Sequence, residues 1–139
     1  MHKRAYLCSY PVFCRLLRGK MKKYLAIIML LPSLVFAQPV SDQTKTEVSY
    51  LLNYLKESGC QFNRNGSWYS AAEAVDHLNT KYEYLLNKGM VTTTEDFISR
   101  AATESSMSGR PYHVKCGTTA EEESGPWLRA VLAKHRAQQ

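Results

Sequence analysis

The chain has 139 residues and a formal net charge of +6, from eighteen Lys and Arg against twelve Asp and Glu. Seven of the basic residues lie in positions 1–37, whereas every acidic residue follows position 37, so residues 38–139 have a net charge close to −1. Nucleic-acid-binding proteins usually have an excess of basic residues, and residues 38–139 lack one, so this charge balance argues against nucleic-acid binding. A segment of this length has room for one modest hydrophobic core, which excludes large multi-step enzymes.

Residues 21–37 have the composition of a secretion signal. Two lysines precede an apolar run, and the small residues Val35 and Ala37 stand where signal peptidase requires them. A membrane-spanning helix needs roughly 20 apolar residues, whereas this run is shorter and contains Pro32. We therefore expect an exported protein with three parts: an upstream extension produced by start-codon choice (1–20), a cleaved signal peptide (21–37) and a single mature domain (38–139).

Two of the four cysteines, Cys60 and Cys116, lie in the predicted mature domain. In an oxidising compartment, an isolated pair is more typical of a disulfide than of a metal site or a catalytic thiol. We expect a Cys60–Cys116 disulfide.

The first half of the domain predicts a helix followed by a hairpin. Apolar residues at positions 48, 51, 52 and 55 have the spacing of one buried helical face over residues 42–58, and Gly59 provides a stop. Residues 60–69 then place aromatic and polar side chains around Asn65-Gly66, the dipeptide that best tolerates a two-residue hairpin turn.

The next two helices are indicated by capping-box patterns. Ser70 with Glu73 begins a helix that ends near Gly89, and Thr93 with Asp96 begins a shorter one that continues to about residue 104. In each case, apolar residues at helical spacing follow the cap.

The remaining segment predicts a loop, a strand and a fourth helix. Residues 105–111 have loop composition, residues 112–116 alternate as in a strand, and a helix begins at Gly125-Pro126 after the acidic residues 121–123. The expected fold class is α+β, with about four helices packed on a small antiparallel sheet made of the hairpin and one further strand.

Four motifs follow one another along the predicted mature domain: Phe62-Asn63-Arg64-Asn65-Gly66, Glu73-Ala74-Val75-Asp76-His77-Leu78, Thr94-Glu95-Asp96-Phe97-Ile98, and the segment from Ser105 to Val114 through Ser106-Met107-Ser108-Gly109-Arg110-Pro111-Tyr112-His113. In this order and spacing they resemble the YfeK-like family of small exported bacterial proteins. The similarity covers about residues 43–135 and implies a periplasmic protein of Gram-negative bacteria. It implies no activity, because the function of that family is unknown.

Glu73 and His77 lie four residues apart on the predicted second helix and share a stripe at the edge of its apolar face. Such a pair could provide acid–base catalysis or half of a metal site. Two ligands are too few for the zinc-protease pattern, and no second His-rich element follows. The alternative is an ordinary helix ion pair, or a histidine bonded to a loop carbonyl. We predict no catalytic residue and no metal.

The loop before the predicted strand could present the hydroxyls of Ser106 and Ser108 and the guanidinium of Arg110 to a polar or anionic ligand. It lacks the Gly-x-Ser-x-Gly elbow of serine hydrolases and any phosphate-loop pattern. The alternative is that the serines only end the third helix and that the glycine and proline turn the chain.

The hairpin adds Arg64 and Trp68. If the disulfide forms, Arg64 and Arg110 could lie near one another. An exposed Trp68 beside Arg64 would make a docking patch, although aromatic residues in so small a domain belong more often to the core.

We therefore predict an uncharacterised, non-enzymatic binding or accessory module of the periplasm, without a cofactor. Its expected partner is another envelope protein or a cell-wall fragment, and neither nucleic acid nor, after signal cleavage, the membrane. The alternatives are an inhibitor of a cell-wall hydrolase, by analogy of size and compartment, and a small enzyme or metal-dependent protein that uses Glu73 and His77. The candidate binding surface comprises Arg64, Asn65, Trp68, Glu73, His77, Ser106, Ser108, Arg110 and Tyr112.

Overall fold

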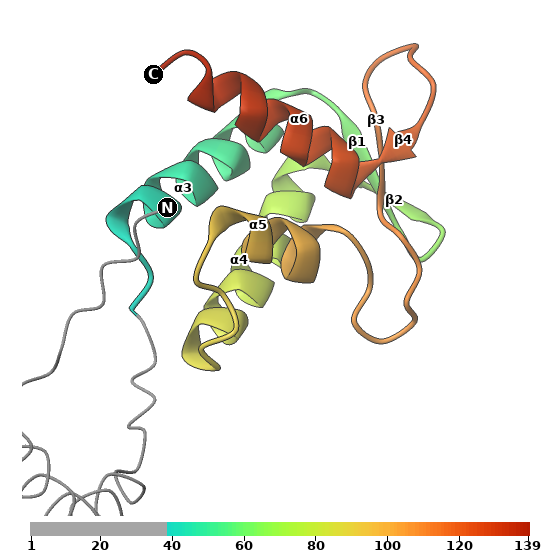
Figure 1. Ribbon diagram of the computed structural model, residues 1–139. Helices are drawn as coiled ribbons and strands as arrows, with labels where there is room; N and C mark the ends of the chain where they lie inside the picture. Colours follow the sequence, from blue (N-terminus) through green and yellow to red (C-terminus); the bar gives the residue numbers. More distant parts are fainter. Residues whose placement is uncertain (1–38) are drawn as a thin grey trace, which may run out of the picture. The chain divides into compact units, whose positions relative to one another are not determined.

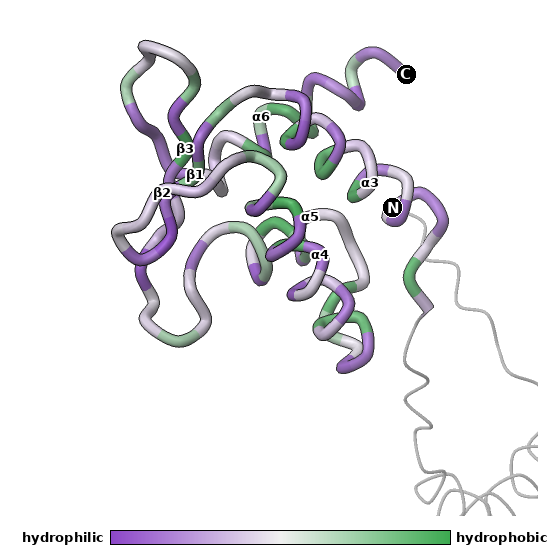
Figure 2. The backbone as a smooth tube through the Cα atoms, turned by 180° about the vertical axis from the view of Figure 1, so that it is seen from behind, coloured by the Kyte–Doolittle hydropathy of each residue, from purple (hydrophilic) through white to green (hydrophobic). Residues whose placement is uncertain are grey.

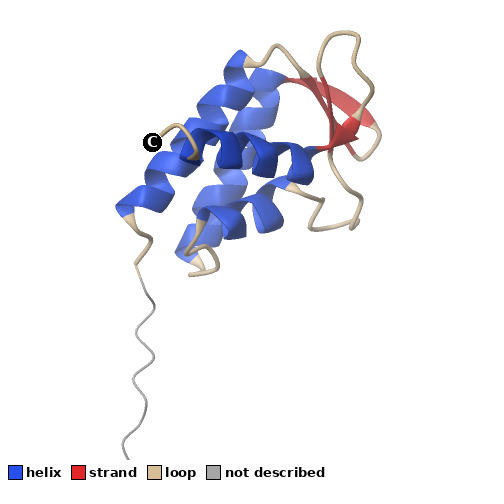
Figure 3. Cartoon of the chain, turned by 45° about the horizontal axis from the view of Figure 1, so that its top comes forward, coloured by secondary structure: helices blue, strands red, loops and turns tan. Residues whose placement is uncertain are grey.

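The computed structural model describes residues 39–139. The extension predicted for 1–20 and the signal peptide predicted for 21–37 lie outside the described residues. Figures 1 and 3 show a group of helices with a small sheet at one end. In chain order the elements are α3 (Asp42–Glu57), β1 (Gln61–Arg64), β2 (Ser67–Ser70), α4 (Ala71–Asn87), α5 (Thr94–Phe97), the π turn η2 (Ile98–Ala102), β3 (His113–Lys115), β4 (Glu122–Glu123) and α6 (Ser124–Arg136).

The helices begin where the sequence predicts. The side chain of Ser41 accepts a hydrogen bond from the Thr44 N–H at the start of α3. Complete capping boxes, Ser70 with Glu73 and Thr93 with Asp96, begin α4 and α5. Each box satisfies backbone N–H groups that have no partner inside the helix. These local sequence patterns therefore fix the three helix starts.

The predicted hairpin is confirmed. Asn65 and Gly66 have φ values of 54° and 90°, the left-handed conformation that a two-residue turn requires. The sheet is antiparallel in the order β2-β1-β3-β4. Phe62 pairs with Tyr69 on one side and with Val114 on the other, so these three side chains share the inner face of the sheet.

The Cys60–Cys116 disulfide is present and links two residues that are 56 positions apart. It lies next to the pairing of Gln61 with Lys115, so it fastens β1 to β3 at the end of their ladder. The predicted α+β class and the disulfide are thus both confirmed.

Two details differ from the sequence-based expectation. The predicted third helix is a short α-helix, α5, which continues as the π turn η2. The carbonyl groups at the end of η2 accept hydrogen bonds from other parts of the chain. The hydroxyl of Ser124 donates to Ala102 O, and the N–H of Tyr112 donates to Thr103 O at 2.9 Å. The acidic residues before α6 form a fourth strand, β4, because His113 and Val114 pair with Glu123 and Glu122.

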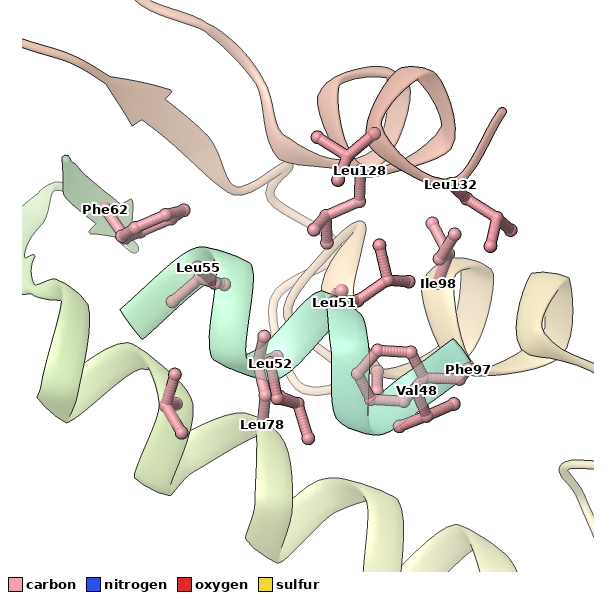
Figure 4. Close-up of a cluster of buried hydrophobic side chains, with 14 of the residues drawn as sticks. Val48, Leu51, Leu52, Leu55, Phe62, Leu78, Phe97, Ile98, Leu128 and Leu132 are labelled. Carbon is pink, nitrogen blue, oxygen red and sulfur yellow. The ribbon is translucent and has the colours of Figure 1, made fainter. Parts of the chain in front are cut away.

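The hydrophobic core lies where the helices meet the inner face of the sheet. Figure 2 shows the apolar stretches of the helices gathered toward the middle of the described part, and Figure 4 shows their side chains interleaved. Leu51, Leu55, Phe97 and Ile98 are fully buried. Burying such a side chain stabilises the fold by roughly 1.5–3 kcal/mol relative to leaving it exposed. The residues labelled in the close-up come from α3, β1, α4, α5, η2 and α6: Val48, Leu51, Leu52, Leu55, Phe62, Leu78, Phe97, Ile98, Leu128 and Leu132.

Candidate functional site

The hairpin turn and the loop that leads into β3 lie at the same end of the sheet (Figure 1). Ser108 Oγ donates a hydrogen bond of 2.7 Å to Asn65 Oδ1, which joins the two segments across 43 positions of sequence. The loop is closed on itself, since Ser105 N–H donates to Arg110 O at 2.9 Å and Gly109 N–H donates to Ser105 O at 2.8 Å. The two segments therefore form one surface with a defined shape.

A cleft of about 430 Å³ lies between them. A second, smaller cavity of about 30 Å³ lies beside it and shares Arg64, His77 and Tyr112 with the cleft. The cleft is lined by Arg64, Asn65, His77, Lys81, Ser105, Ser106, Met107 and Tyr112. The small cavity is lined by Phe62, Asn63, Arg64, Tyr69, Glu73, Ala74, His77, Leu78, Ala102 and Tyr112.

His77 and Tyr112 meet at the boundary between the two hollows. His77 Nε2 lies 3.3 Å from the Tyr112 hydroxyl, and the two rings meet edge to face. Burial and the charges of Arg64 and Lys81 lower the pKa of His77, which keeps its imidazole neutral near neutral pH. Burial raises the pKa of Tyr112, so its hydroxyl stays protonated and can donate to the neutral imidazole.

Glu73 does not orient His77, contrary to the catalytic interpretation of this pair. Its carboxylate accepts from the N–H and the hydroxyl of Ser70, at 2.9 and 2.7 Å, within the capping box of α4. Hydrogen bonds with the Ser70 side chain and backbone lower the pKa of Glu73. The histidine instead pairs with Tyr112. Residues 39–139 contain no group of three or more His, Cys, Asp or Glu side chains placed to hold a metal ion.

Two cations face the cleft from different elements. The Arg64 guanidinium lies over the Tyr69 ring, 4.5 Å from its centroid. Lys81 Nζ donates to Glu104 O at 3.0 Å and lies 5.2 Å from the centroid of the Tyr112 ring. Burial and the charge of Arg64 lower the pKa of Lys81, whereas the charge of Glu104 raises it. The cleft therefore has a positive, partly desolvated wall.

The structure brings most of the candidate surface residues together. Arg64, Asn65, His77, Ser106 and Tyr112 line the cleft, Glu73 lines the small cavity, and Ser108 bonds to Asn65. Arg110 and Trp68 line neither hollow.

Trp68 is exposed, at 39%, but lies on the other face of the sheet from Arg64. Trp68 pairs with Asn63, and paired residues of adjacent strands face the same side of a sheet. Phe62 and Arg64 flank Asn63 in β1 and point to the opposite, inner side, because successive residues of a strand alternate between the two faces. The docking patch expected from Trp68 and Arg64 together is therefore absent from the described surface.

Lys81 is the charged cleft residue that the predicted binding surface did not include. Its spacing is the available signal, since Glu73, His77 and Lys81 recur every fourth residue along α4 and so lie on one helical stripe. Ser105 and Met107 in the loop and Tyr69 in the hairpin also line the two hollows, although the predicted binding surface did not include these three residues.

Comparison with known proteins places the chain among proteins of unknown function. Residues 42–136 match the model of a family of unknown function, DUF5329. The chain is 34% identical over 94 residues, 66% of its length, to "Uncharacterized protein YfeK" of Salmonella typhimurium, of which it covers 77%. No solved structure matches the chain. Within residues 39–139, no helix combines the length and the apolarity that crossing a bilayer requires. The resemblance to the YfeK-like family is thus confirmed, and the chain belongs to the DUF5329 family of unknown function.

Proposed function

We propose that the protein is a non-enzymatic binding module of the Gram-negative periplasm, and that its ligand occupies the cleft between the hairpin turn and the loop 105–112. The hydrogen bond between Ser108 and Asn65 is the observation on which the proposal rests. It holds two segments that are far apart in the sequence in one fixed arrangement, with a cleft of ligand size between them.

The export proposal depends on the sequence and on the disulfide. The signal-like segment 21–37 directs a chain to the secretory pathway, and the Cys60–Cys116 bond persists in an oxidising compartment. Both features support a protein that works in the periplasm.

Binding without catalysis is supported by the way the titratable groups are used. Glu73 caps α4, and His77 faces a protonated tyrosine and two cations rather than an acid and a nucleophile. Such an arrangement positions hydrogen-bonding groups and positive charge around a ligand, but it does not assemble the nucleophile–base–orienter set of a hydrolase.

An amide-resolved NMR titration tests the proposal. Protein expressed from the full sequence, with the N-terminus that the cell leaves, is titrated with protein, cell-wall peptide and small-molecule fractions of a bacterial envelope. We expect one fraction to shift the amides of residues 64–65 and 105–112 together. Ser108→Ala should weaken this binding because it releases the loop from the hairpin, whereas Trp68→Ala, on the opposite sheet face, should leave it unchanged. Shifts confined to other surfaces, or none in any fraction, would overturn the proposed site.

A further inference from the structure

The two cations of the cleft have no carboxylate bonded to them in the described structure, although the charge of Glu104 acts on Lys81 from a distance. Among the described residues, neither Arg64 nor Lys81 forms an ion pair with an acidic side chain. Lys81 is bonded to the backbone oxygen of Glu104. The Glu73 carboxylate at the small cavity is engaged in the cap of α4. Because residues 38–139 have almost no net charge, this pair of cations is a local concentration, and it favours an anion in the cleft.

The cleft also offers neutral hydrogen-bonding groups to such an anion. Ser106 and Asn65 line the cleft, and so do His77, with its neutral imidazole, and Tyr112, whose hydroxyl lies 3.3 Å from that ring. An Arg fork and a Lys ammonium are the groups that proteins use for carboxylates and phosphates. Charge alone therefore does not distinguish the two anions.

The small cavity favours a carboxylate over a phosphate because of its size and its apolar walls. Apart from the residues it shares with the cleft, its walls include the apolar side chains of Phe62, Ala74, Leu78 and Ala102. Its 30 Å³ exceed the roughly 10–15 Å³ that one water needs and are far below the size of an aromatic ring. A single methyl group fits this space. The methyl would then lie next to Arg64, which lines both hollows.

An alanine at a free peptide C-terminus has this combination, because its methyl group and its carboxylate are bonded to the same carbon. In a phosphate ester, an oxygen separates the anion from the first carbon. We propose that the cleft, if it is the ligand site proposed above, binds the free C-terminus of a peptide that ends in alanine. The carboxylate contacts Arg64 and Lys81, the methyl group enters the small cavity, and the preceding residues lie along the wider cleft past Met107.

Acetyl-dialanine, in its all-L and all-D forms, is the first probe. Calorimetric titration of the protein with both forms separates a ribosomally made protein tail, which is L, from a cell-wall peptide, which contains D-alanine. We expect one form to bind, and to bind about tenfold more tightly than the same peptide with a C-terminal amide, because the amide removes the charge that the two cations recognise. Replacing the last alanine by phenylalanine should also weaken binding about tenfold, because the ring exceeds the cavity.

Variants of the two cations and of the cavity wall test the named contacts. Lys81→Met and Arg64→Gln should each weaken binding of acetyl-dialanine by about tenfold. Lys88→Met is the matched control, because Lys88 lies at the C-terminal end of the same helix over Tyr84 and lines neither hollow. Ala74→Leu should fill the small cavity and abolish the preference for alanine over glycine at the peptide end. Amide spectra of each variant show whether the fold is kept.

The inference is overturned if neither enantiomer of acetyl-dialanine binds, or if the peptide with a free carboxylate and the peptide with a C-terminal amide bind alike. It is overturned as well if the peptide that ends in phenylalanine binds as well as the one that ends in alanine, or if glycerol phosphate at equal concentration displaces the peptide. It is also overturned if both cation variants bind like the wild type. If an envelope fraction still shifts residues 64–65 and 105–112 in these cases, the cleft remains the binding site and only the alanine C-terminus is wrong. If no fraction shifts them, the proposed site itself is wrong.

Discussion

Arg136 donates two hydrogen bonds to the buried carboxylate of Glu47, from Nε to Oε1 at 2.8 Å and from Nη2 to Oε2 at 2.7 Å. Its third nitrogen, Nη1, donates to Glu95 Oε1 at 2.6 Å. One guanidinium therefore connects the last turn of α6 to α3 and α5. Glu47 is only 2% exposed, so its charge depends on this partner and on hydrogen bonds from Thr94 and Gln43.

Arg136→Met should lower the free energy of unfolding by about 2 kcal/mol, because it leaves a buried carboxylate without its cation. The cost stays below that of a fully buried pair, since the Arg136 side chain is 40% exposed and water can reach the vacated position. Urea unfolding measures the difference. Arg129→Met, an exposed position on the same helix without an ion pair in the described structure, is the control and should change the stability by less than about 0.5 kcal/mol. Equal losses in the two variants would contradict the connecting role of Arg136.

The same ion pair predicts a loss of stability in acid. The hydrogen bonds from Arg136 hold the pKa of Glu47 at about 2, against an ordinary value of 4.5. Because the folded-state pKa is the lower one, the stabilisation is fully present above 4.5 and is lost as the pH falls from 4.5 to about 2. Allowing for the half-exposed arginine, it is of the order of 2 kcal/mol.

Glu47→Gln isolates this contribution, because Asp96, Glu95 and Glu73 also have lowered pKa values and titrate in both proteins. The difference in unfolding free energy between wild type and variant should be largest near neutral pH and should shrink as the pH approaches about 2. A difference that does not change with pH would show that Glu47 contributes through packing alone.

Replacing both cysteines by alanine should lower the stability by about 2–4 kcal/mol, because the disulfide closes a long loop and restricts the unfolded chain. Thermal unfolding of the double variant, and of wild type with and without a reductant, checks this. Reduced wild type and the double variant should unfold at similar temperatures. If reduction has no effect, the covalent link makes no contribution to stability.

Gly125→Ala should destabilise the protein by about 1–3 kcal/mol, because α6 begins in close contact with the end of η2. A Cβ at position 125 would lie 2.7 Å from Thr103 Oγ1, and that hydroxyl is already bonded to Ile98 O at 2.8 Å. A double-mutant cycle with Thr103→Ala measures the contact. The second substitution should make Gly125→Ala less costly, whereas additive losses would show that the two residues do not interfere.

Features that depend only on neighbouring residues could be predicted from the sequence. The capping boxes at Ser70 and Thr93 and the Asn65-Gly66 turn follow from short-range hydrogen bonding and from φ preference, so each could be predicted from a few positions. The disulfide followed from the count of cysteines, because a single pair in the predicted mature domain leaves one partner for each.

The Asn65-Gly66 turn also determines which hairpin side chains share a face of the sheet. Because a two-residue turn fixes the hairpin register, it pairs Trp68 with Asn63 and places the tryptophan on the face opposite Arg64. The patch expected from these two residues was therefore wrong for a reason that the sequence contains.

Contacts between residues that are far apart in the sequence depend on the tertiary fold. Strand β4 consists of two exposed glutamates with no strand pattern of their own, and it forms because the edge of β3 accepts them. The contacts of Arg136 with Glu47 and of Ser108 with Asn65 span 89 and 43 positions. Lys81 enters the cleft because α4 packs beside the loop that contains Tyr112. Such contacts depend on how whole elements pack, which no local pattern specifies, and the cleft is built from them.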